Sequence, residues 1–234
     1  MKIAVVVPAL DEARRIEGAI QSARARGRDE SEKFAGPRVE IVVVDGGSRD
    51  ETVLRAREAG VRVVGSSPGR GRQLQAGVEA SESDVVLFLH ADSRLEPGWE
   101  VAIQEALRDP GVVGGAFGLR FDERASAALR LVEWVANLRA RWLAMPYGDQ
   151  AIFARRAALV AAGGVPDAVV MEDLDLVRAL KRQGRIAVLP LPVTTSARRH
   201  LGAGVLRTAL RHTLALLAWR LDLDRGRVAA WLRR

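Results

Sequence analysis

The sequence predicts an α/β fold in which a mostly parallel, Rossmann-like sheet is flanked by helices. Its apolar, β-branched runs are continuous rather than alternating, which indicates strands buried on both faces. Stretches with helical spacing separate the first four runs, as expected for parallel strands joined by helices. Polar residues follow the ends of these strands, where open sheets of this kind bind their ligands.

The expected elements follow one another along the whole chain. Strands are expected at 3–9, 40–47, 62–67, 84–92, 112–121, 150–156 and 185–193. Helices are expected at 11–26, 50–59 and 70–80, with amphipathic helical stretches at 125–145 and 205–234. An Arg-rich surface loop is expected at 24–38.

Composition excludes several classes of protein. The chain has 234 residues, of which 48% are hydrophobic, so it can form a sizeable core. No apolar run approaches the ~18 to 20 residues of a membrane-spanning helix, and the short apolar N-terminus resembles a strand rather than a signal peptide. The absence of cysteine excludes disulfides and thiolate metal sites. We expect a cytoplasmic protein, with peripheral contact at the inner face of the membrane as an option.

The net charge of +7 favours phosphate-bearing partners in general. Most of this charge comes from arginine, a bias that a GC-rich genome also explains. With 5% aromatic residues the chain offers no platform on which bases could stack, so no nucleic-acid partner is expected.

The first two strands end in acidic residues. Pro8-Ala9-Leu10-Asp11-Glu12 contains no glycine, which argues against a dinucleotide-binding turn, and its acids also suit the first turn of a helix. Asp45 is followed by two glycines, a pattern in which a carboxylate can accept hydrogen bonds from a ligand. Ser48 and Glu51 fit a capping box that starts the next helix.

The third and fourth strands end in a glycine-arginine turn and in an aspartate. Arg70 and Arg72 open a helix beside Gly69 and Gly71, an arrangement that suits a phosphate. Asp92 ends the fourth strand. It either caps the following turn or binds a divalent cation that bridges to substrate phosphates. The conjunction of the four strand ends favours the second interpretation.

Two later segments carry further acids. Gly148-Asp149-Gln150 precedes a strand, and Glu172, Asp173 and Asp175 begin an expected helix. Because a helix face recurs every three or four residues, these three acids cannot all point the same way. At most one or two of them can act as a general base, and the alternative is that they stabilise the first turn.

This ordered set of motifs resembles family 2 glycosyltransferases with the GT-A fold, and most of all a small single-domain bacterial branch. The resemblance covers roughly residues 1–200. It implies a GT-A domain with a nucleotide-binding part at about 1–95 and an acceptor or catalytic part at about 96–200, followed by a C-terminal helical extension at 201–234.

The resemblance also implies roles for individual residues. The nucleotide would be bound by Pro8, Ala9, Glu12, Asp45, Gly46, Ala91 and, near the base or diphosphate, Arg72. Asp92 would bind Mn²⁺ or Mg²⁺, Asp173 would be the general base beside Glu172, and Asp149 and Gln150 would lie near the sugar or acceptor.

The sequence departs from the family pattern in two places. His90 stands where the family has the first Asp of Asp-x-Asp, and the Gln-x-x-Arg-Trp motif of processive members is missing. Ser196-Ala197-Arg198-Arg199-His200 stands in its place. The resemblance makes His200 a candidate second metal ligand and both arginines candidate diphosphate contacts, and the alternative is a solvated loop.

The implied reaction is metal-dependent, inverting, non-processive transfer of a sugar from a nucleotide-diphosphate sugar, by family habit a UDP-sugar, to a hydroxyl acceptor. A nucleotidyltransferase and a non-catalytic polyanion-binding module are the alternatives. The acceptor is small or lipid-linked. Trp134, Trp142 and Tyr147 either line the acceptor pocket or belong to the core. The basic C-terminal helix would contact the membrane, pack on the domain or bind a second subunit in a homodimer.

Overall fold

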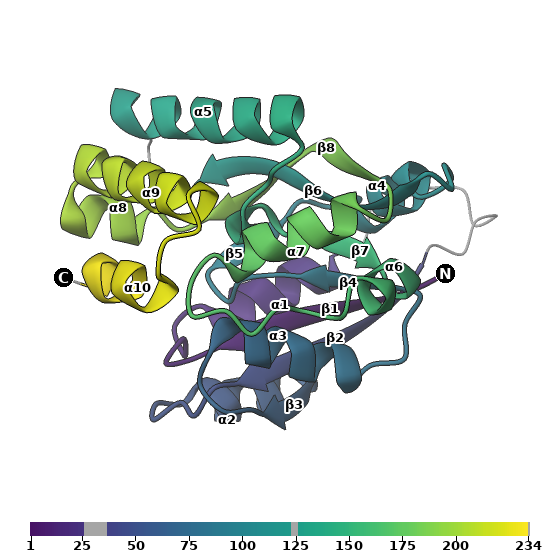
Figure 1. Ribbon diagram of the computed structural model, residues 1–234. Coiled ribbons are helices and arrows are strands. Elements are labelled where there is room, and N and C mark those ends of the chain that lie inside the picture. The colour runs from purple at the N-terminus through teal and green to yellow at the C-terminus, as the bar shows by residue number, and fades with distance from the viewer. Residues whose placement is uncertain (26–36, 123–125, 234) are drawn as a thin grey trace.

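The computed structural model describes residues 1–25, 37–122 and 126–233. One eight-stranded sheet runs through the described chain in the order β3-β2-β1-β4-β7-β6-β8-β5, with helices packed on both of its faces (Figure 1). The expected mixed α/β fold with flanking helices is thereby confirmed.

The first half of the sheet is parallel. β1 (Lys2–Ala9) pairs in parallel with β2 (Arg38–Asp45) and with β4 (Val85–Phe88), and β2 pairs with β3 (Arg62–Gly65). The connecting helices are α1 (Ile16–Arg24), α2 (Thr52–Glu58) and α3 (Arg70–Glu79). Alternate residues of β1 belong to two separate apolar clusters, one on each face of the sheet, which explains why the run is apolar without alternation.

The second half of the sheet is mixed. β7 (Phe153–Arg155) lies antiparallel to both β4 and β6 (Val112–Phe121), and β6 pairs in parallel with β8 (Arg185–Thr195). β5 (Ser93–Leu95) closes the far edge antiparallel to β8. A Cβ on Gly114 would lie 2.5 Å from the carbonyl oxygen of Phe153, so β6 depends on glycine to approach β7 this closely.

Hydrogen bonds connect the loops after β1 and β2, and the two helices that follow these loops begin later than the sequence predicts. α1 begins at Ile16 rather than at 11, because Asp11 adopts the left-handed conformation (φ 54°) and its N–H donates to Ser48 Oγ at 3.0 Å. The expected capping box of Ser48 and Glu51 is therefore wrong. Asp50, two residues before α2 begins, accepts instead from the N–H of Thr52, the first residue of the helix, at 2.9 Å.

The remaining helices cover the second half of the sheet and one end of the molecule. They are α4 (Trp99–Ala106), α5 (Ala127–Leu143), the 3₁₀ turn η1 (Gly148–Gln150), α6 (Arg156–Ala161), α7 (Glu172–Lys181), α8 (Arg198–Ala203), α9 (Val205–Arg220) and α10 (Arg225–Arg233). The tail expected as one helical stretch is two helices, separated at Asp222 with φ 54°. Within the part of the chain that the structure describes, no helix has the length and apolar character needed to span a membrane.

Candidate active site

A cavity of about 770 Å³ opens beside the carboxyl end of β4. It is walled by the turn after β4, by η1, by the start of α7 and by α8 and α9. The candidate site residues that line it are Asp92, Asp149, Glu172, Asp173 and His200, joined by Arg70, His90, Tyr147, Gly148 and Arg198. Residues from positions 70 to 212 therefore meet in one place, as the strand-end argument predicts.

Asp173 lies in the first turn of α7 and faces this cavity. Its Oδ2 accepts a 2.7 Å hydrogen bond from the N–H of Gly148. A Cβ on Gly148 would lie 3.1 Å from His90 Nε2, so the His90 ring would have to shift slightly, and it would contact the Cβ of Asp173 at 3.5 Å. The hydrogen bond from Gly148 fixes the orientation of one carboxylate oxygen while the side chain remains at the cavity wall.

Glu172, next to Asp173, is buried with 5% of its surface exposed. Burial raises the pKa of its carboxyl above the ordinary value, an effect that Arg70, at 3.5 Å, opposes and that the neighbouring charge of Asp173 reinforces. Met171, the residue before α7, has a φ of 61° in the left-handed region. A backbone conformation that is strained for methionine therefore precedes the helix at the cavity wall.

Asp175 points away from the cavity toward the C-terminal helices. It accepts from Trp219 Nε1 at 2.9 Å and pairs with Arg225 at 2.6 Å. Burial alone would raise the pKa of Asp175, but the bonds from Arg225 and Trp219 outweigh it and hold the pKa below its usual value. Two of the three acids face the cavity and the third does not, as the helical spacing predicts.

Asp92 makes an ion pair rather than capping a turn. Its Oδ2 lies 3.2 Å from Nη2 of Arg198, and no backbone N–H of the described residues donates to its side chain. The same guanidinium also binds the carboxylate of Glu12, with Nη1 at 3.1 Å from Oε2. Arg198 therefore joins the end of β1 to the end of β4 through two acids, and these bonds raise the pKa of its guanidinium.

The residues here fit a divalent cation that is bound partly by substrate. Asp92 lies on the cavity wall and its carboxylate already takes a positive group as its partner. Within the described residues no group of three histidines or acids is arranged to hold a metal alone. Mg²⁺ and Mn²⁺ sites built from one or two protein ligands and phosphate oxygens match this donor set.

His200 lies on α8 and not on a solvated loop, so that alternative is wrong. Its ring is buried, lines the cavity, and lies 5.0 Å from the ring of Phe121 and 5.8 Å from that of His212. The side chain of Arg199, the other candidate diphosphate contact in this segment, lies outside the described part of the chain.

The expected nucleoside-binding residues form the neighbouring edge of the sheet. The carboxylate of Asp45 accepts from the N–H groups of Gly47 and Ser48 at 3.0 and 3.1 Å, so it also shapes its own turn. Gly46 N–H bonds to the carbonyl of Ala9 at 2.9 Å. Pro8, Ala9, Glu12, Asp45, Gly46 and Ala91 all lie outside the wall of the large cavity.

Arg70 and Arg72, both expected at a phosphate-binding turn, point in different directions. Arg72 is exposed and pairs with Asp167 at 3.0 Å, whereas Arg70 lines the cavity. Residues two positions apart on a helix do not share a face, and the residue pattern does not show which of the two arginines faces the site.

Gln150 is fully buried and contacts the protein rather than the cavity. Its Nε2 donates to the carbonyl of Phe117 at 3.0 Å, and its Oε1 accepts from the N–H of Tyr147 at 3.2 Å. The structure thus places Gln150 behind the site, where it holds η1. Asp149 does line the cavity.

The aromatic residues separate into two groups. Tyr147 lines the cavity with the Arg139 guanidinium 3.3 Å from its ring centroid, and burial raises the pKa of its hydroxyl. Trp134 and Trp142 are 60% and 79% exposed on α5. The expectation that these two tryptophans belong to the acceptor pocket or to the core is therefore wrong.

Sequence reasoning missed two residues that support the site. Gln73 is buried on α3, and its Nε2 donates to the carbonyls of Ala9 and Val44, both at 2.9 Å, fixing the ends of β1 and β2. Arg139 stacks on Tyr147 and reaches Gln150 at 3.4 Å. The only signal for Gln73 was an amide on the apolar side of a helix, and Arg139 gave none.

This chain belongs to glycosyltransferase family 2. The model of that family, described as "Glycosyl transferase family 2", matches residues 4–161, more than half of the chain. The protein is thus a glycosyltransferase with a GT-A fold, and the residues of the cavity and of the adjoining sheet edge are its candidate site.

Similar sequences come from mycobacteria. An uncharacterized protein of Mycobacterium tuberculosis is 29% identical over 229 residues, which cover 84% of this chain and 67% of that protein. A glucosyl-3-phosphoglycerate synthase of Mycolicibacterium paratuberculosis is 37% identical over 99 residues. That match covers 38% of this chain and 28% of the synthase, so the chain matches less than a third of its length.

Similar structures extend over nearly the whole chain. A crystal structure of a mycobacterial protein has a TM-score of 0.64 and 27% identity, covering 96% of this chain and 76% of that one. Glucosyl-3-phosphoglycerate synthase of Mycobacterium tuberculosis, crystallised with Mn²⁺, UDP and glucosyl-3-phosphoglycerate, has a TM-score of 0.60 and 25% identity, covering 95% and 81%. The same synthase has also been crystallised with Mg²⁺ and UDP.

Proposed function

We propose that this protein is a metal-dependent, inverting and non-processive glycosyltransferase that moves a hexosyl group from a UDP-sugar to a hydroxyl acceptor. One observation carries the proposal: Asp92 and Asp173 face a single cavity, the first bound to a cationic side chain and the second fixed by Gly148. A carboxylate for a cation and a separate carboxylate for a proton are the two groups that single displacement needs.

The general base is Asp173. With Oδ2 oriented by Gly148, it takes the proton of the acceptor hydroxyl as that oxygen attacks the sugar carbon. Glu172 is less suited to this task, because its carboxyl is buried and pairs with Arg70 at 3.5 Å. We assign Glu172 the role of holding Arg70 at the cavity wall.

The cation would be held by Asp92, with His200 as a second candidate on the same wall. Bound there as Mn²⁺ or Mg²⁺, it supplies positive charge to the departing diphosphate. Arg198, within reach of Asp92, would bind a diphosphate oxygen once its bond to Asp92 is released. Glu12, Asp45 and the backbone around Pro8, Ala9, Gly46 and Ala91 would hold the nucleoside, and Arg72 stays a candidate contact to the base.

We propose UDP as the nucleotide that carries the donor sugar, because similar synthases were crystallised with UDP and, in one case, UDP-glucose. For the acceptor we propose a small or lipid-linked hydroxyl compound near Asp149 and Tyr147. A synthase of this similarity has been crystallised with phosphoglyceric acid. The curated match covers only 38% of this chain, so it supports the reaction type more than that acceptor.

We further propose the domain division stated above, with the nucleotide part at about 1–95, the acceptor part at about 96–200 and the helical extension beyond. Asp92 then closes the nucleotide part, while Asp149, Asp173 and His200 belong to the acceptor part. On this division the cavity would be lined by all three parts, since Thr208 and His212 of the extension also line it.

The test is calorimetric titration of UDP and GDP, each with Mn²⁺, with Mg²⁺ and with chelator. We expect UDP to bind with either metal, chelator to weaken binding, and Asp92→Ala to abolish the metal requirement together with most of the affinity. Glu58→Ala, an exposed acid on α2, is the matched control. Metal-independent UDP binding that survives Asp92→Ala would remove the basis of the mechanism.

A further inference from the structure

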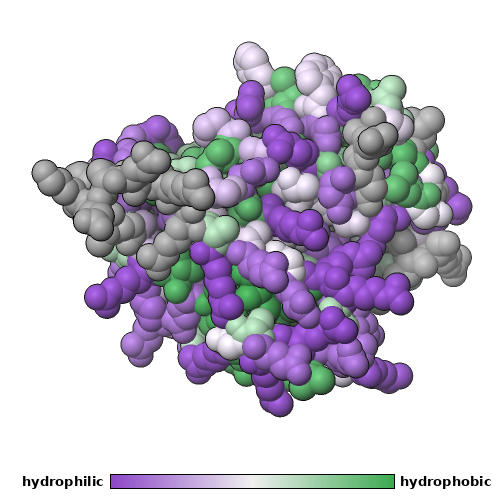
Figure 2. All heavy atoms as spheres, turned by 180° about the vertical axis from the view of Figure 1, so that it is seen from behind, coloured by the Kyte–Doolittle hydropathy of each residue, from purple (hydrophilic) through white to green (hydrophobic). Residues whose placement is uncertain are grey.

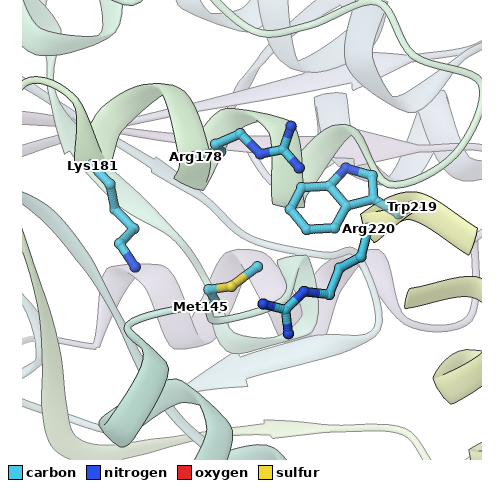
Figure 3. Close-up of a pocket in the computed structure, with 5 residues that line it drawn as sticks. All are labelled: Met145, Arg178, Lys181, Trp219 and Arg220. Carbon is cyan, nitrogen blue, oxygen red and sulfur yellow. The ribbon is translucent and has the colours of Figure 1, made fainter. Parts of the chain in front are cut away.

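A second cavity, of about 270 Å³, lies at the C-terminal ends of α5, α7 and α9 (Figure 3). Its lining is Met145, Arg178, Lys181, Trp219 and Arg220, without any acid. Figure 3 shows the three cationic side chains arranged around the opening, with the Arg178 guanidinium 4.0 Å from the Trp219 ring centroid. We refer to this cavity as the basic pocket.

The cations of the basic pocket form no ion pair with an acid of the described residues. No carboxylate there lies within ion-pair distance of Arg178, Lys181 or Arg220. Asp175, whose charge attracts Arg178 more weakly, is bound to Arg225 and Trp219. Three cations that line one cavity without a direct acidic partner favour an anion such as a phosphate.

An apolar surface runs up to this pocket. The outward face of α5 carries Leu131, Trp134, Val135, Leu138 and Trp142, all between 39% and 79% exposed. Their spacing places them on one helix face, opposite the buried Leu129, Ala136 and Ala140. α5 lies along the top of the molecule in Figure 1, and in Figure 2, which shows the molecule from behind, some hydrophobic side chains lie at the upper right among hydrophilic ones.

The neighbouring helix α9 has a second exposed stripe of leucines, Leu210, Leu214, Leu217 and, just beyond it, Leu221. α5 and α9 contact each other, and the two stripes meet the basic pocket at their C-terminal ends. Arg220 is three residues from Leu217 and so shares its face. The Lys181 ammonium donates to the carbonyl of Leu143, the last residue of α5, at 2.8 Å.

We propose that these two stripes dock on an anionic lipid bilayer and that the basic pocket binds a lipid phosphate. Exposed tryptophans beside arginine and lysine are the residue types that anchor proteins at the boundary between lipid headgroups and acyl chains. A second copy of this chain suits the face less well. A symmetric dimer would bring the same three cations of both copies into one interface, and each copy carries a net charge of +7.

This surface differs from the membrane contact expected of the C-terminal tail alone. Trp219 of α9 is buried, and Arg225 of α10 is fixed to Asp175, so these residues pack on the domain. The two most exposed tryptophans, Trp134 and Trp142, belong to α5, whereas Trp231 of α10 is 40% exposed. The proposal does not depend on the proposed transferase chemistry, because no residue of it has been placed in the active site.

The experiment is co-sedimentation of the full chain with phosphatidylcholine vesicles and with mixed phosphatidylcholine–phosphatidylglycerol vesicles. We expect binding to the mixed vesicles only. Trp134→Ser/Trp142→Ser should weaken it more than roughly tenfold, since the apolar anchor is lost. Lys181→Gln/Arg220→Gln should weaken it about fivefold per charge.

Matched controls carry the same kinds of change elsewhere. Leu54→Ser/Val101→Ser alters side chains that are 54% and 40% exposed on α2 and α4, and Arg57→Gln/Arg108→Gln removes two exposed charges, one on α2 and one just after α4. Both controls should bind the mixed vesicles as the parent does. Circular dichroism and UDP calorimetry should give parent values for every variant, which separates loss of docking from misfolding and from failure of the proposed function.

Three results would overturn the proposal. Equal loss of binding in the controls would show only a general charge effect. A dimer in sedimentation velocity that Trp134→Ser/Trp142→Ser converts to monomer, with no vesicle binding by either, would assign the face to a second copy. Binding of free inorganic phosphate in the basic pocket without vesicle binding would make it a site for a soluble anion.

Discussion

Nη2 of Arg198 lies 3.2 Å from Oδ2 of Asp92, while the same side chain is bound to Glu12. A diphosphate that enters with a cation offers Arg198 a stronger partner and offers Asp92 a different positive group. We therefore expect the ion pair between Arg198 and Asp92 to break when the donor binds, with Arg198 turning to the diphosphate and Asp92 to the cation.

We predict that Arg198→Gln weakens UDP–Mn²⁺ binding by roughly tenfold to a hundredfold, the usual range for a lost charged hydrogen bond. Arg15→Gln is the control, because Arg15 also approaches Glu12 but only at 3.8 Å. Calorimetry measures both. Equal affinities for the two variants would show that Arg198 serves only to hold Glu12.

Asp173→Asn should lower kcat by about 10² to 10⁴ while the KM for the donor changes little, because an amide cannot take the acceptor proton. Donor turnover is followed by release of the nucleotide diphosphate, and product stereochemistry is read by NMR. The variant can still accept the bond from Gly148, so the fold should be retained. An unchanged kcat would transfer the base role to another residue.

Gly148→Ala should lower kcat about tenfold or more without a matching loss of donor affinity. Its Cβ would lie 3.1 Å from His90 Nε2, so the His90 ring would have to shift by a few tenths of an ångström beside Asp173, whose Oδ2 would lie at a contact distance of 3.4 Å. A shift of this size at the cavity wall is expected to disturb the alignment of the base with its substrate. Gly65→Ala, where an added Cβ has no atom within 4 Å, is the control. Steady-state kinetics on both variants distinguishes displacement of the base from a general effect of replacing glycine.

Asp175→Asn should destabilise the protein by about 1–2 kcal/mol at neutral pH, since Arg225 and the Trp219 N–H lose a charged partner. The pKa of Asp175 is lowered, so its contribution is complete above the ordinary value of 3.8 and is lost as the pH falls through the native-state pKa. Urea unfolding should show the difference from the parent shrinking below about pH 4.

Glu172→Gln should show the opposite dependence on pH. Because burial raises the pKa of Glu172, the parent loses stability as the pH rises from the ordinary value of 4.5 through the native-state pKa. The variant has no such charge, so over this pH interval its free energy of unfolding should rise relative to that of the parent. Paired urea titrations at several pH values test it, and a constant difference would contradict the proposed burial effect.

The sequence predicted the parallel half of the sheet because each of its strands is a continuous apolar run. It could not predict that β7 is antiparallel, since direction depends on which edge the returning chain reaches rather than on local residue pattern. The Ser48–Glu51 capping box failed for a related reason: Ser48 is satisfied by Asp11, 37 residues earlier.

The candidate site was predicted in outline. Strand-end position sufficed for Asp92, and helical spacing separated Asp173 from Asp175. The residue pattern of α3 does not show which way its two arginines point, so it could not predict that Arg70 and not Arg72 lines the large cavity. Gln73 and Arg139 act through contacts with distant backbone and an aromatic ring, which no local pattern reports.

One short helix carries both the proposed base and two cations of the basic pocket. Asp173 begins α7, and Arg178 and Lys181 follow five and eight residues later, or about 7.5 and 12 Å along the axis. A rigid rod of this length has no joint at which the two sites could move independently. If the basic pocket binds a lipid headgroup, α7 holds Asp173 at a fixed distance from the bilayer surface. The hydroxyl of an acceptor embedded in lipid would have to extend only that distance to meet the base.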